Sequence, residues 1–396
     1  MTTTQRSLRT CFWSSTLVGV GLLVSVFSLG PGWTGSVAHA QTTEEMAERI
    51  TETAAANLGG SEPVPVFELD PSWPKPLPNN WGIGIVWGVA VDSRDHVWVV
   101  NQTAGRYMEA IEEAGEVPAP AVLEFDQEGN LVQAWGEPGQ GGWTQGEGRP
   151  FPAQAINVDW KGNVWVSEER RGHAVVKFSR DGEFLLQIGE VDKTNGSADT
   201  ALLGAPSGLD FYPEANEVYI ADGYVNQRII VFDADTGEYK RHWGRYGLPP
   251  DDSFESGDQP TWVPSPFLVG RPPNQSSMLP RYAHGVNVSR DGLVYAADRS
   301  HGVLFVHQRD GTYVREAAVP GPFNSVAFSS DPEQHYVYAG GMNATGRIFI
   351  LRRSDLQILG SFKSSGQHYM DADSKGNLFT CGRRMPQRWV LKESPK

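Results

Sequence analysis

The chain has 396 residues, of which 39% are hydrophobic and 11% aromatic, enough for a substantial core, so general disorder is excluded. The net charge of −14 makes nucleic acid and anionic lipid surfaces poor partners, and no nucleic-acid partner is expected. Glycine and proline number 44 and 27, which indicates many short elements joined by turns and favours an all-β fold.

Residues 1–40 have the pattern of a signal peptide. Arg6 and Arg9 precede an apolar run over residues 17–29, and the sequence Ala-His-Ala at 38–40 matches a small-x-small cleavage site. The apolar run is too short for a comfortable membrane span. We therefore expect an exported protein, periplasmic or secreted, that is monomeric and has no stable membrane insertion. An uncleaved anchor is the alternative.

Residues 41–62 are expected to form an N-terminal helix or leader, because Thr42 and Glu45 resemble a capping box and an apolar stripe follows them. Several prolines then exclude a helix between residues 62 and 78. The extended run at residues 64–69 lies among these prolines and has no local partner for strand pairing.

After residue 80 a hairpin unit recurs six times. In each copy a short apolar strand leads through a turn to a second strand that carries one aromatic residue. These aromatic markers are Trp98, Trp165, Tyr219, Tyr295, Tyr338 and Phe379. A third apolar run and usually a fourth follow each hairpin, which is the pattern of a propeller blade.

The sixth repeat has three recognisable strands and then the chain stops, which would leave the outer edge of its sheet unpaired. We expect residues 63–70 to supply the missing fourth strand and so to join the two ends of the ring. The sequence thus predicts an all-β, six-bladed β-propeller of four-stranded antiparallel blades over residues 63–396, closed by an N-terminal strand.

The residues that open the first strands should all face the central funnel at one end of the ring. These openings are Trp87, Gln154, Ser207, His284, Asn324 and His368. Blades two, four and six lie about 120° apart around a sixfold ring, so Gln154, His284 and His368 should converge. Such a convergence suits one metal ion with open coordination positions.

The repeated motif Asp-x-x-Gly-Asn-Val-Trp-Val resembles the NHL-repeat propellers over roughly residues 80–392, and the Gly-His and Trp-Asp signatures of the WD40 type are missing. Within that group, three segments look like the matching parts of peptidyl-α-hydroxyglycine α-amidating lyase, also called peptidylamidoglycolate lyase. They are Ala-Asp-Gly-Tyr-Val-Asn-Gln-Arg at 221–228, Ala-His-Gly at 283–285 and Ala-Asp-Arg at 297–299.

In the lyase family three histidines from alternate blades bind zinc, while a tyrosine and two arginines surround the substrate. The resemblance therefore implies that His284 and His368 are zinc ligands and that Tyr224 and Arg299 are catalytic residues. Gln154 stands where the third histidine is expected and would complete the metal site.

Two other positions depart from the family pattern. Gln102 stands where the second arginine would be, and Tyr369 where an acidic residue follows the histidine. Gln102 remains a substrate-binding candidate, and Arg106 or Arg383 could reach the funnel from neighbouring loops to supply the missing carboxylate clamp.

Three functions are compatible with these residues. The resemblance implies a metal-dependent lyase that cleaves the C–N bond of an α-hydroxyglycine and releases an amide and glyoxylate. The alternative is a non-catalytic exported propeller that binds a small molecule or peptide in the funnel, or a protein partner on its loop rim. A lactonase-type hydrolase with structural calcium is the third, for which Asn324, Asn287 and Asp222 are available.

Each matched residue also has a structural explanation, such as a turn histidine or an ion pair between Asp298 and Arg299.

Two insertions, at residues 104–120 and 245–280, are expected to be lids or partner-binding loops, the first with a short helix. Cys381 lies in a second strand and is expected to be buried and inert.

Overall fold

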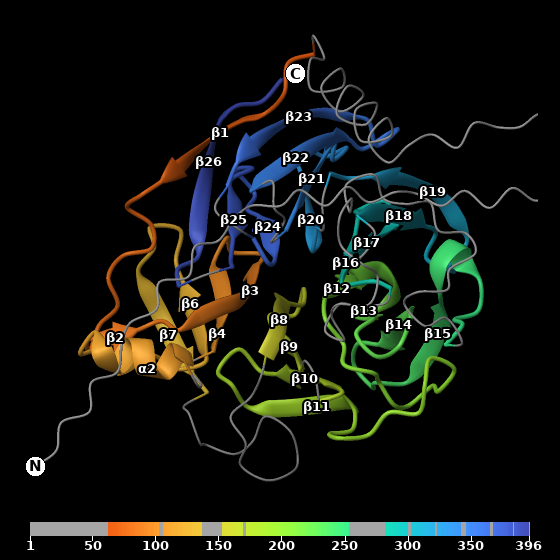
Figure 1. Cartoon of the computed structure of the whole chain (residues 1–396), viewed down its shortest axis with the longest axis horizontal. Coiled ribbons are helices and arrows are strands. Elements are labelled where there is room, and N and C mark those ends of the chain that lie inside the picture. Colours follow the sequence, from red (N-terminus) through yellow and green to blue (C-terminus); the bar gives the residue numbers. More distant parts are fainter. Residues whose placement is uncertain are drawn as a thin grey trace, which may run out of the picture. The chain divides into compact units, whose positions relative to one another are not determined.

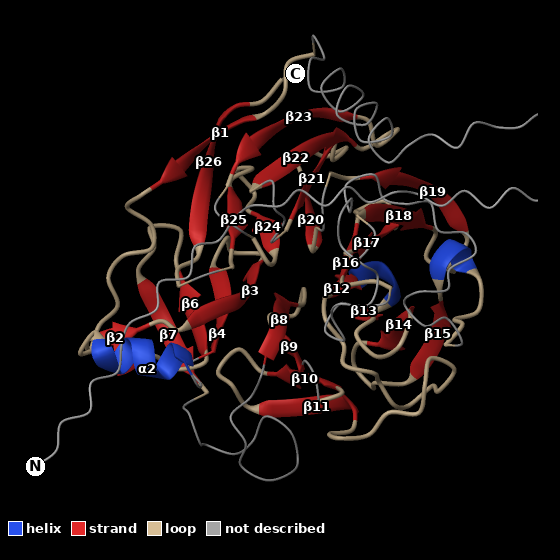
Figure 2. Cartoon of the chain, viewed as in Figure 1, coloured by secondary structure: helices blue, strands red, loops and turns tan. Residues whose placement is uncertain are grey.

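The computed structural model describes residues 62–102, 106–136, 153–168, 172–252, 282–299, 302–320, 323–341, 346–364, 367–382 and 384–395. Within these residues six four-stranded antiparallel sheets surround a common centre, so the chain is a six-bladed β-propeller, as predicted (Figure 1). Strands make up nearly all of its regular structure (Figure 2). The predicted signal peptide and nearly all of the leader lie outside the described residues, among which no helix is long and apolar enough to cross a membrane.

The blades follow one another along the chain, and each runs from an inner strand to an outer one. Blade one consists of β3 (Ile85–Val91), β4 (Val97–Gln102), β6 (Val122–Phe125) and β7 (Leu131–Trp135). Blade two consists of β8 (Ala153–Val158), β9 (Val164–Glu168), β10 (Ala174–Phe178) and β11 (Phe184–Gly189). Blade three consists of β12 (Leu209–Tyr212), β13 (Glu217–Asp222), β14 (Arg228–Asp233) and β15 (Tyr239–Trp243).

The second half of the ring repeats this order. Blade four consists of β16 (Gly285–Val288), β17 (Val294–Asp298), β18 (Val303–His307) and β19 (Tyr313–Ala318). Blade five consists of β20 (Ser325–Phe328), β21 (Tyr336–Gly340), β22 (Arg347–Arg352) and β23 (Ile358–Lys363). Blade six consists of β24 (Met370–Ala372), β25 (Leu378–Thr380), β26 (Gln387–Glu393) and β1 (Val66–Asp70).

Strand β1 closes the ring, because it pairs antiparallel with β26 from the other end of the chain. Asp70 lies opposite Arg388 in this register, and their side chains form an ion pair at 2.5 Å. Phe67 packs between blades, with its ring 5.1 Å from that of Phe362 and 5.3 Å from that of Tyr338. The predicted closing strand is confirmed, although it begins at Val66.

The repeated motif is explained by the turn between the first two strands of a blade. In blade two, one oxygen of Asp159 accepts hydrogen bonds from the backbone N–H groups of Lys161 and Asn163, both at 2.9 Å. Its other oxygen accepts a bond of 3.0 Å from the indole N–H of Trp165. Gly162 has a φ of +82°, in the left-handed region that favours glycine. The motif therefore both forms the turn and fixes the buried tryptophan.

The hydrophobic core lies mainly between neighbouring blades. All six aromatic markers of the second strands are 2% exposed or less. In blade two, for example, the Trp165 side chain packs in one cluster with Leu209 and Phe211 of blade three. Because each blade covers the face of the next, the ring has one continuous set of interfaces.

Two parts of the insertions are described. The first contains the predicted short helix, α2 (Arg106–Glu113), beside a two-stranded parallel pairing of β2 (Trp81–Gly82) with β5 (Val117–Pro118). A short 3-10 turn, η1 (Pro213–Ala215), joins β12 to β13 within blade three, and a second one, η2 (Arg245–Gly247), follows β15 at the start of the second insertion. Residues 253–281 of the second insertion lie outside the described residues, so the expectation of a lid or partner loop there stays a prediction.

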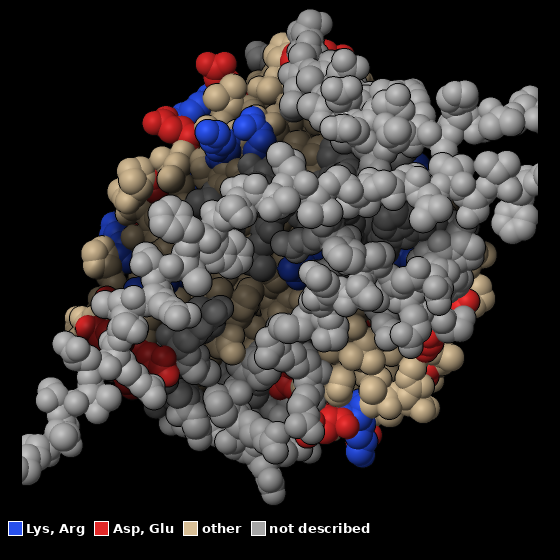
Figure 3. All heavy atoms as spheres, in the orientation of Figure 1, with Lys and Arg blue, Asp and Glu red and all other residues tan. Residues whose placement is uncertain are grey.

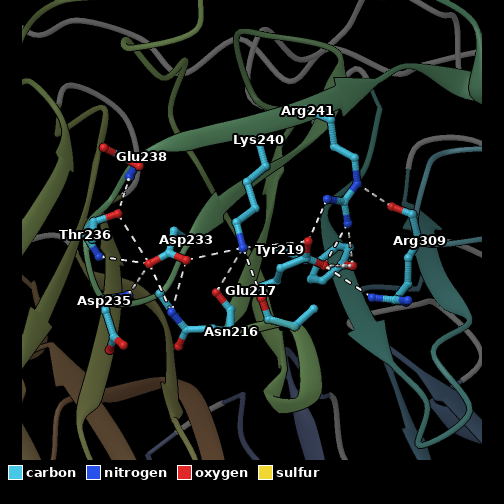
Figure 4. A network of polar contacts seen from close by, with 12 residues as sticks. Asn216, Glu217, Tyr219, Asp233, Asp235, Thr236, Glu238, Lys240, Arg241 and Arg309 are labelled. Atoms are coloured by element: carbon cyan, nitrogen blue, oxygen red, sulfur yellow. Dashed lines mark hydrogen bonds and ion pairs between the residues drawn. The ribbon is translucent and has the colours of Figure 1, made fainter.

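Acidic and basic side chains are interspersed around the periphery of the face shown in Figure 3. In blade three they join into one network (Figure 4). Both oxygens of Glu217 accept hydrogen bonds of 2.7 Å from Arg241, and one also accepts a bond of 2.6 Å from the hydroxyl of Tyr219. The Nε of Arg241 donates to the carbonyl of Arg309 in blade four at 2.5 Å. These bonds outweigh burial and lower the pKa of Glu217.

Candidate functional site

Gln154, His284 and His368 meet at the mouth of the propeller. Gln154 lies at the start of β8, His284 directly precedes β16, and His368 lies two residues before β24. The side-chain Nε2 of Gln154 is 3.2 Å from Nε2 of His284 and 3.1 Å from Nε2 of His368. Side chains that are separated by more than eighty residues therefore share one point, because alternate blades direct their first-strand openings at the funnel.

Both imidazoles are held in one tautomer by backbone carbonyls. Nδ1 of His284 lies 3.1 Å from the carbonyl oxygen of Asn324, and Nδ1 of His368 lies 2.6 Å from that of Trp87. A carbonyl oxygen only accepts, so each Nδ1 must carry the proton and donate it. The lone pair of each ring is therefore on Nε2 and points at the shared centre.

The two histidines are neutral at physiological pH. Burial lowers the pKa of His368 to about 3, and the positive charge of Arg299 adds to this effect. The pKa of His284 is also lowered well below its usual range, mainly by burial and further by Arg299. Both side chains consequently offer lone pairs rather than protons to a ligand.

Tyr224 and Arg299 join the same cluster from blades three and four. The hydroxyl oxygen of Tyr224 lies 3.0 Å from Nε2 of Gln154, and it accepts a hydrogen bond of 3.4 Å from Nη1 of Arg299. The Tyr224 ring meets that of His284 edge to face at a centroid distance of 5.6 Å. The structure thus brings together all four residues that match the lyase family, with Gln154 at their centre.

The segment that carries Tyr224 is fixed by a buried ion pair. Arg228 and Asp222 are fully buried, and Nε of Arg228 lies 2.9 Å from the Asp222 carboxylate. Asn226 donates to the same carboxylate at 2.7 Å. A side chain at Gly223 would come within 2.1 Å of backbone carbonyls of the next blade, so only glycine fits. The motif Asp-Gly-Tyr-x-Asn-x-Arg is therefore a device that holds the tyrosine at the funnel.

Of the three predicted substrate-binding residues, only Gln102 has a side chain whose position is described. The side-chain oxygen of Gln102 accepts a hydrogen bond of 2.6 Å from the indole N–H of Trp87. The Trp87 ring in turn meets His368 edge to face at 4.9 Å, so Gln102 touches the cluster through Trp87. Arg106 is the first residue of α2, but its side chain is not among those described, and Arg383 lies outside the described residues.

Sequence reasoning treated Tyr369 only as a departure from the family pattern. Its ring stacks on His284 at a centroid distance of 5.4 Å and an interplanar angle of 23°. Its hydroxyl donates to the backbone carbonyl of His284 at 3.2 Å. Tyr369 therefore holds the imidazole of His284 in place, a role that no local feature of the sequence indicated.

Buried polar atoms without partners also surround the funnel. Among the described residues they include the side-chain oxygen of Gln154 and both amide atoms of Asn324 and Gln367. All three side chains are at most 1% exposed. Buried polar groups are normally hydrogen-bonded, so unpartnered ones mark a place that receives water or a polar ligand. The sequence alone did not indicate that these buried amides would lack hydrogen-bond partners.

A polar channel continues from the cluster along the propeller axis. The cavity has a volume of about 250 Å³ and is lined by residues from all six inner strands, including Tyr369, Asp210 and Asp371. Each aspartate accepts a backbone N–H of the next blade at 2.7 Å, from Val288 and Val91 respectively. Burial raises the pKa of Asp210 to about 7 and that of Asp371 to about 6.

The donor set does not fit the zinc ion that the resemblance implies. An open zinc site takes three protein ligands through nitrogen, thiolate or carboxylate. Here two imidazoles are present, and the third position directs an amide nitrogen at the centre, whose lone pair is delocalised into its carbonyl. Arg299 adds positive charge to the same region. Asp222, considered for calcium, is paired with Arg228.

The expectation that Cys381 is buried is confirmed, and burial raises the pKa of its thiol to about 12. The ion pair expected between Asp298 and Arg299 was one structural explanation for that arginine. Asp298 forms an ion pair of 2.8 Å with Arg245. Arg299 itself contacts Tyr224, which favours a place for it in the funnel.

The chain is homologous to proteins of two kinds, although no protein-family model matches it. It is 23% identical over 317 residues to peptidyl-glycine alpha-amidating monooxygenase A of Xenopus laevis, a match that covers 75% of this chain and 29% of that protein. It is 24% identical over 347 residues to NHL repeat-containing protein 3 of Mus musculus, a match that covers 82% of this chain and 84% of that protein.

The chain thus spans less than a third of the length of the amidating relatives that it matches first. Among solved structures, a streptogramin B lyase superposes with a TM-score of 0.49 at 11% identity, covering 83% of this chain and 98% of that one.

Proposed function

We propose that the funnel binds α-hydroxyglycine-type substrates and cleaves their C–N bond, releasing a primary amide and glyoxylate. The observation that carries this proposal is the meeting of Tyr224 and Arg299 with two neutral imidazoles at one buried point. The homology to peptidyl-glycine alpha-amidating monooxygenases supports it. Arg299 suits the substrate carboxylate, because a guanidinium pairs with a carboxylate through parallel hydrogen bonds.

The reaction can be written with the chain's own groups. Tyr224 acts in this step as a phenolate, whose negative charge the neighbouring guanidinium of Arg299 stabilises, and it accepts the proton of the substrate hydroxyl. The electron pair of that O–H bond forms the aldehyde C=O, the C–N bond breaks, and its electron pair goes to the amide nitrogen. The same proton then returns to that nitrogen, so no net proton is released. His284 and His368 keep the neighbouring side chains in place.

Glyoxylate release from an α-hydroxyglycyl peptide tests the proposal. We expect release with the native protein and a loss of about 10²–10⁴-fold in kcat with Tyr224→Phe, because the proton acceptor is removed. Tyr246→Phe is the matched control, since Tyr246 lies in η2 and is 38% exposed. Absence of glyoxylate with folded native protein, or equal losses in both variants, would contradict the proposal.

Binding without turnover is the second candidate. The observation that favours it is the set of unpartnered amides at Asn324 and Gln367, which can bind a polar small molecule or peptide but have no acid or base to offer. A non-reactive analogue that carries the same carboxylate would then bind, measured by calorimetry, while no glyoxylate appears. Arg299→Met should weaken this binding about tenfold or more, because the carboxylate loses its cation. The alternative of a protein partner on the 245–280 loop stays a prediction.

We also propose that the protein is exported and cleaved before Gln41, on the strength of the signal pattern in residues 1–40. Mass spectrometry of the protein recovered outside the cytoplasm measures its N-terminus. A chain that retains residues 1–40 in that fraction would show an anchor instead.

A further inference from the structure

The centre of the funnel is organised by one carboxamide. In both His284 and His368 the protonated Nδ1 donates to a backbone carbonyl, so the lone pair is on Nε2. The two Nε2 atoms lie 3.2 and 3.1 Å from the same nitrogen of Gln154. An amide nitrogen has two N–H groups and no available lone pair. The same nitrogen also donates to the hydroxyl of Tyr224 at 3.0 Å, so the two N–H groups serve both imidazoles and this hydroxyl.

The reverse orientation of this amide is unfavourable. With the amide rotated, the side-chain oxygen of Gln154 would face two imidazole lone pairs, and no proton would lie between them. In the observed orientation that oxygen is buried without a partner. An unsatisfied buried acceptor is unfavourable, so the hydrogen bonds of the amide to the two histidines and Tyr224 must outweigh this loss.

A divalent metal would have to displace this amide. Zinc binds imidazole nitrogen at about 2.0–2.1 Å, so an ion bonded to both Nε2 atoms would lie against the amide nitrogen that now faces them. The guanidinium of Arg299 also lies near this point, since its Nη1 is 3.4 Å from the Tyr224 hydroxyl, which is 3.0 Å from the amide nitrogen. A positive charge so close disfavours a doubly charged ion at the same place.

We propose that the Gln154 carboxamide takes the place of a metal ion: its two N–H groups hold the imidazoles of His284 and His368, and the native protein binds no divalent metal tightly in the funnel. The single change Gln154→His would replace two donors with one lone pair. Three nitrogen ligands from alternate blades would then face one point, which is the donor set of an open zinc site. This inference concerns binding only and holds whether or not the protein turns over a substrate.

Metal binding by the purified full chain tests the proposal, with zinc measured by calorimetry and element analysis and cobalt by its visible absorption. We expect less than about a tenth of an equivalent of zinc in the native protein. Gln154→His should bind about one equivalent, at least about a hundredfold more tightly than the native protein, with the absorption of tetrahedral cobalt. Gln154→Glu, which adds an anionic ligand, should show a smaller gain.

Gln367→His is the matched control, because Gln367 is also a buried glutamine and precedes His368 in the sequence, but no hydrogen bond to either imidazole is found for it among the described residues. It should bind zinc no better than the native protein. Near-ultraviolet circular dichroism establishes that each variant is folded. The proposal is overturned if the native protein retains one zinc per chain, or if folded Gln154→His and Gln154→Glu both fail to gain affinity. A gain in Gln367→His equal to that in Gln154→His would also overturn it.

Discussion

The buried charges of blade three and the buried amides of the funnel beside it differ in how completely they are paired. In blade three, Glu217 has both carboxylate oxygens paired by Arg241 (Figure 4). Asp222 is paired by the fully buried Arg228. In the funnel, Gln154 leaves one buried oxygen without a partner, and Asn324 leaves its whole amide. The paired region holds the backbone in position, and the unpaired region has polar groups free for a ligand. The paired residues of blade three therefore support the site, whereas the buried amides of the funnel are the groups that can contact a ligand.

Removing one partner of the buried pair should have the largest effect on stability. Arg228→Met leaves the Asp222 carboxylate buried without its cation, and such a loss costs about 3–5 kcal/mol. The free energy of unfolding in urea measures it. Because the same pair holds Tyr224, we expect funnel binding to weaken as well. As a control, Arg352→Met removes an arginine that pairs with Glu62 and Asp355 at the surface, and should leave the free energy of unfolding nearly unchanged. Equal costs would break the comparison.

The second-largest expected effect is a pH dependence of stability that comes from Glu168. This residue ends β9 and lies opposite Ala153 of β8. Burial raises its pKa to about 8, so the folded state binds a proton that the unfolded state releases above its usual pKa of 4.5. Stability contributed by this group is therefore complete at low pH and is lost as pH rises from about 4.5 to about 8. The total loss is on the order of a few kcal/mol.

Glu168→Gln should remove that part of the pH dependence and stabilise the protein above pH 8. Unfolding free energies of both proteins between pH 4 and 9 provide the measurement. Glu183→Gln is the control, since Glu183 lies in an exposed turn before β11, and should leave the profile unchanged. Parallel profiles for Glu168→Gln and the native protein would show that Glu168 ionises normally.

The smallest expected effect is a change in stability on replacing a buried glutamine, and it tests directly whether hydrogen-bond pairing distinguishes the two regions. Gln367 is buried with both amide atoms unpaired, so Gln367→Leu should stabilise the fold by about 1 kcal/mol. Gln227 is also buried, but its amide donates to the carbonyl of Asp251 at 2.9 Å. Gln227→Leu should therefore destabilise by about 1 kcal/mol. Thermal unfolding at matched pH gives both values, and changes of the same sign would mean that pairing does not distinguish the two regions.

Much of the fold was predictable because its signals are local. The aromatic marker recurs in every blade, and the Asp-x-x-Gly-Asn turn joins the first two strands in blades two and six, so blade number and strand order follow from counting the hairpins. The closing strand followed from a missing pairing partner, and β1 pairs with β26 as expected. Its first residue was misplaced, since strand ends depend on pairing geometry rather than composition.

The candidate site was predictable in outline. The order of the blades placed Gln154, His284 and His368 around one axis, and the structure brings their side chains together. The contact of Tyr224 with Arg299 lies between blades three and four and had no local signal. The support of His284 by Tyr369 had none either, because the two residues come from different repeats.

By itself, the sequence determined a six-bladed ring and the residues that open each first strand, because hydrophobic period and turn chemistry act within a few residues. Only the tertiary structure decided what the funnel centre is. The tautomers of His284 and His368 are set by carbonyls of other blades, and the orientation of the Gln154 amide is set by both imidazoles together. Hydrogen-bond roles depend on partners that are close in space, and here those partners are far apart along the chain.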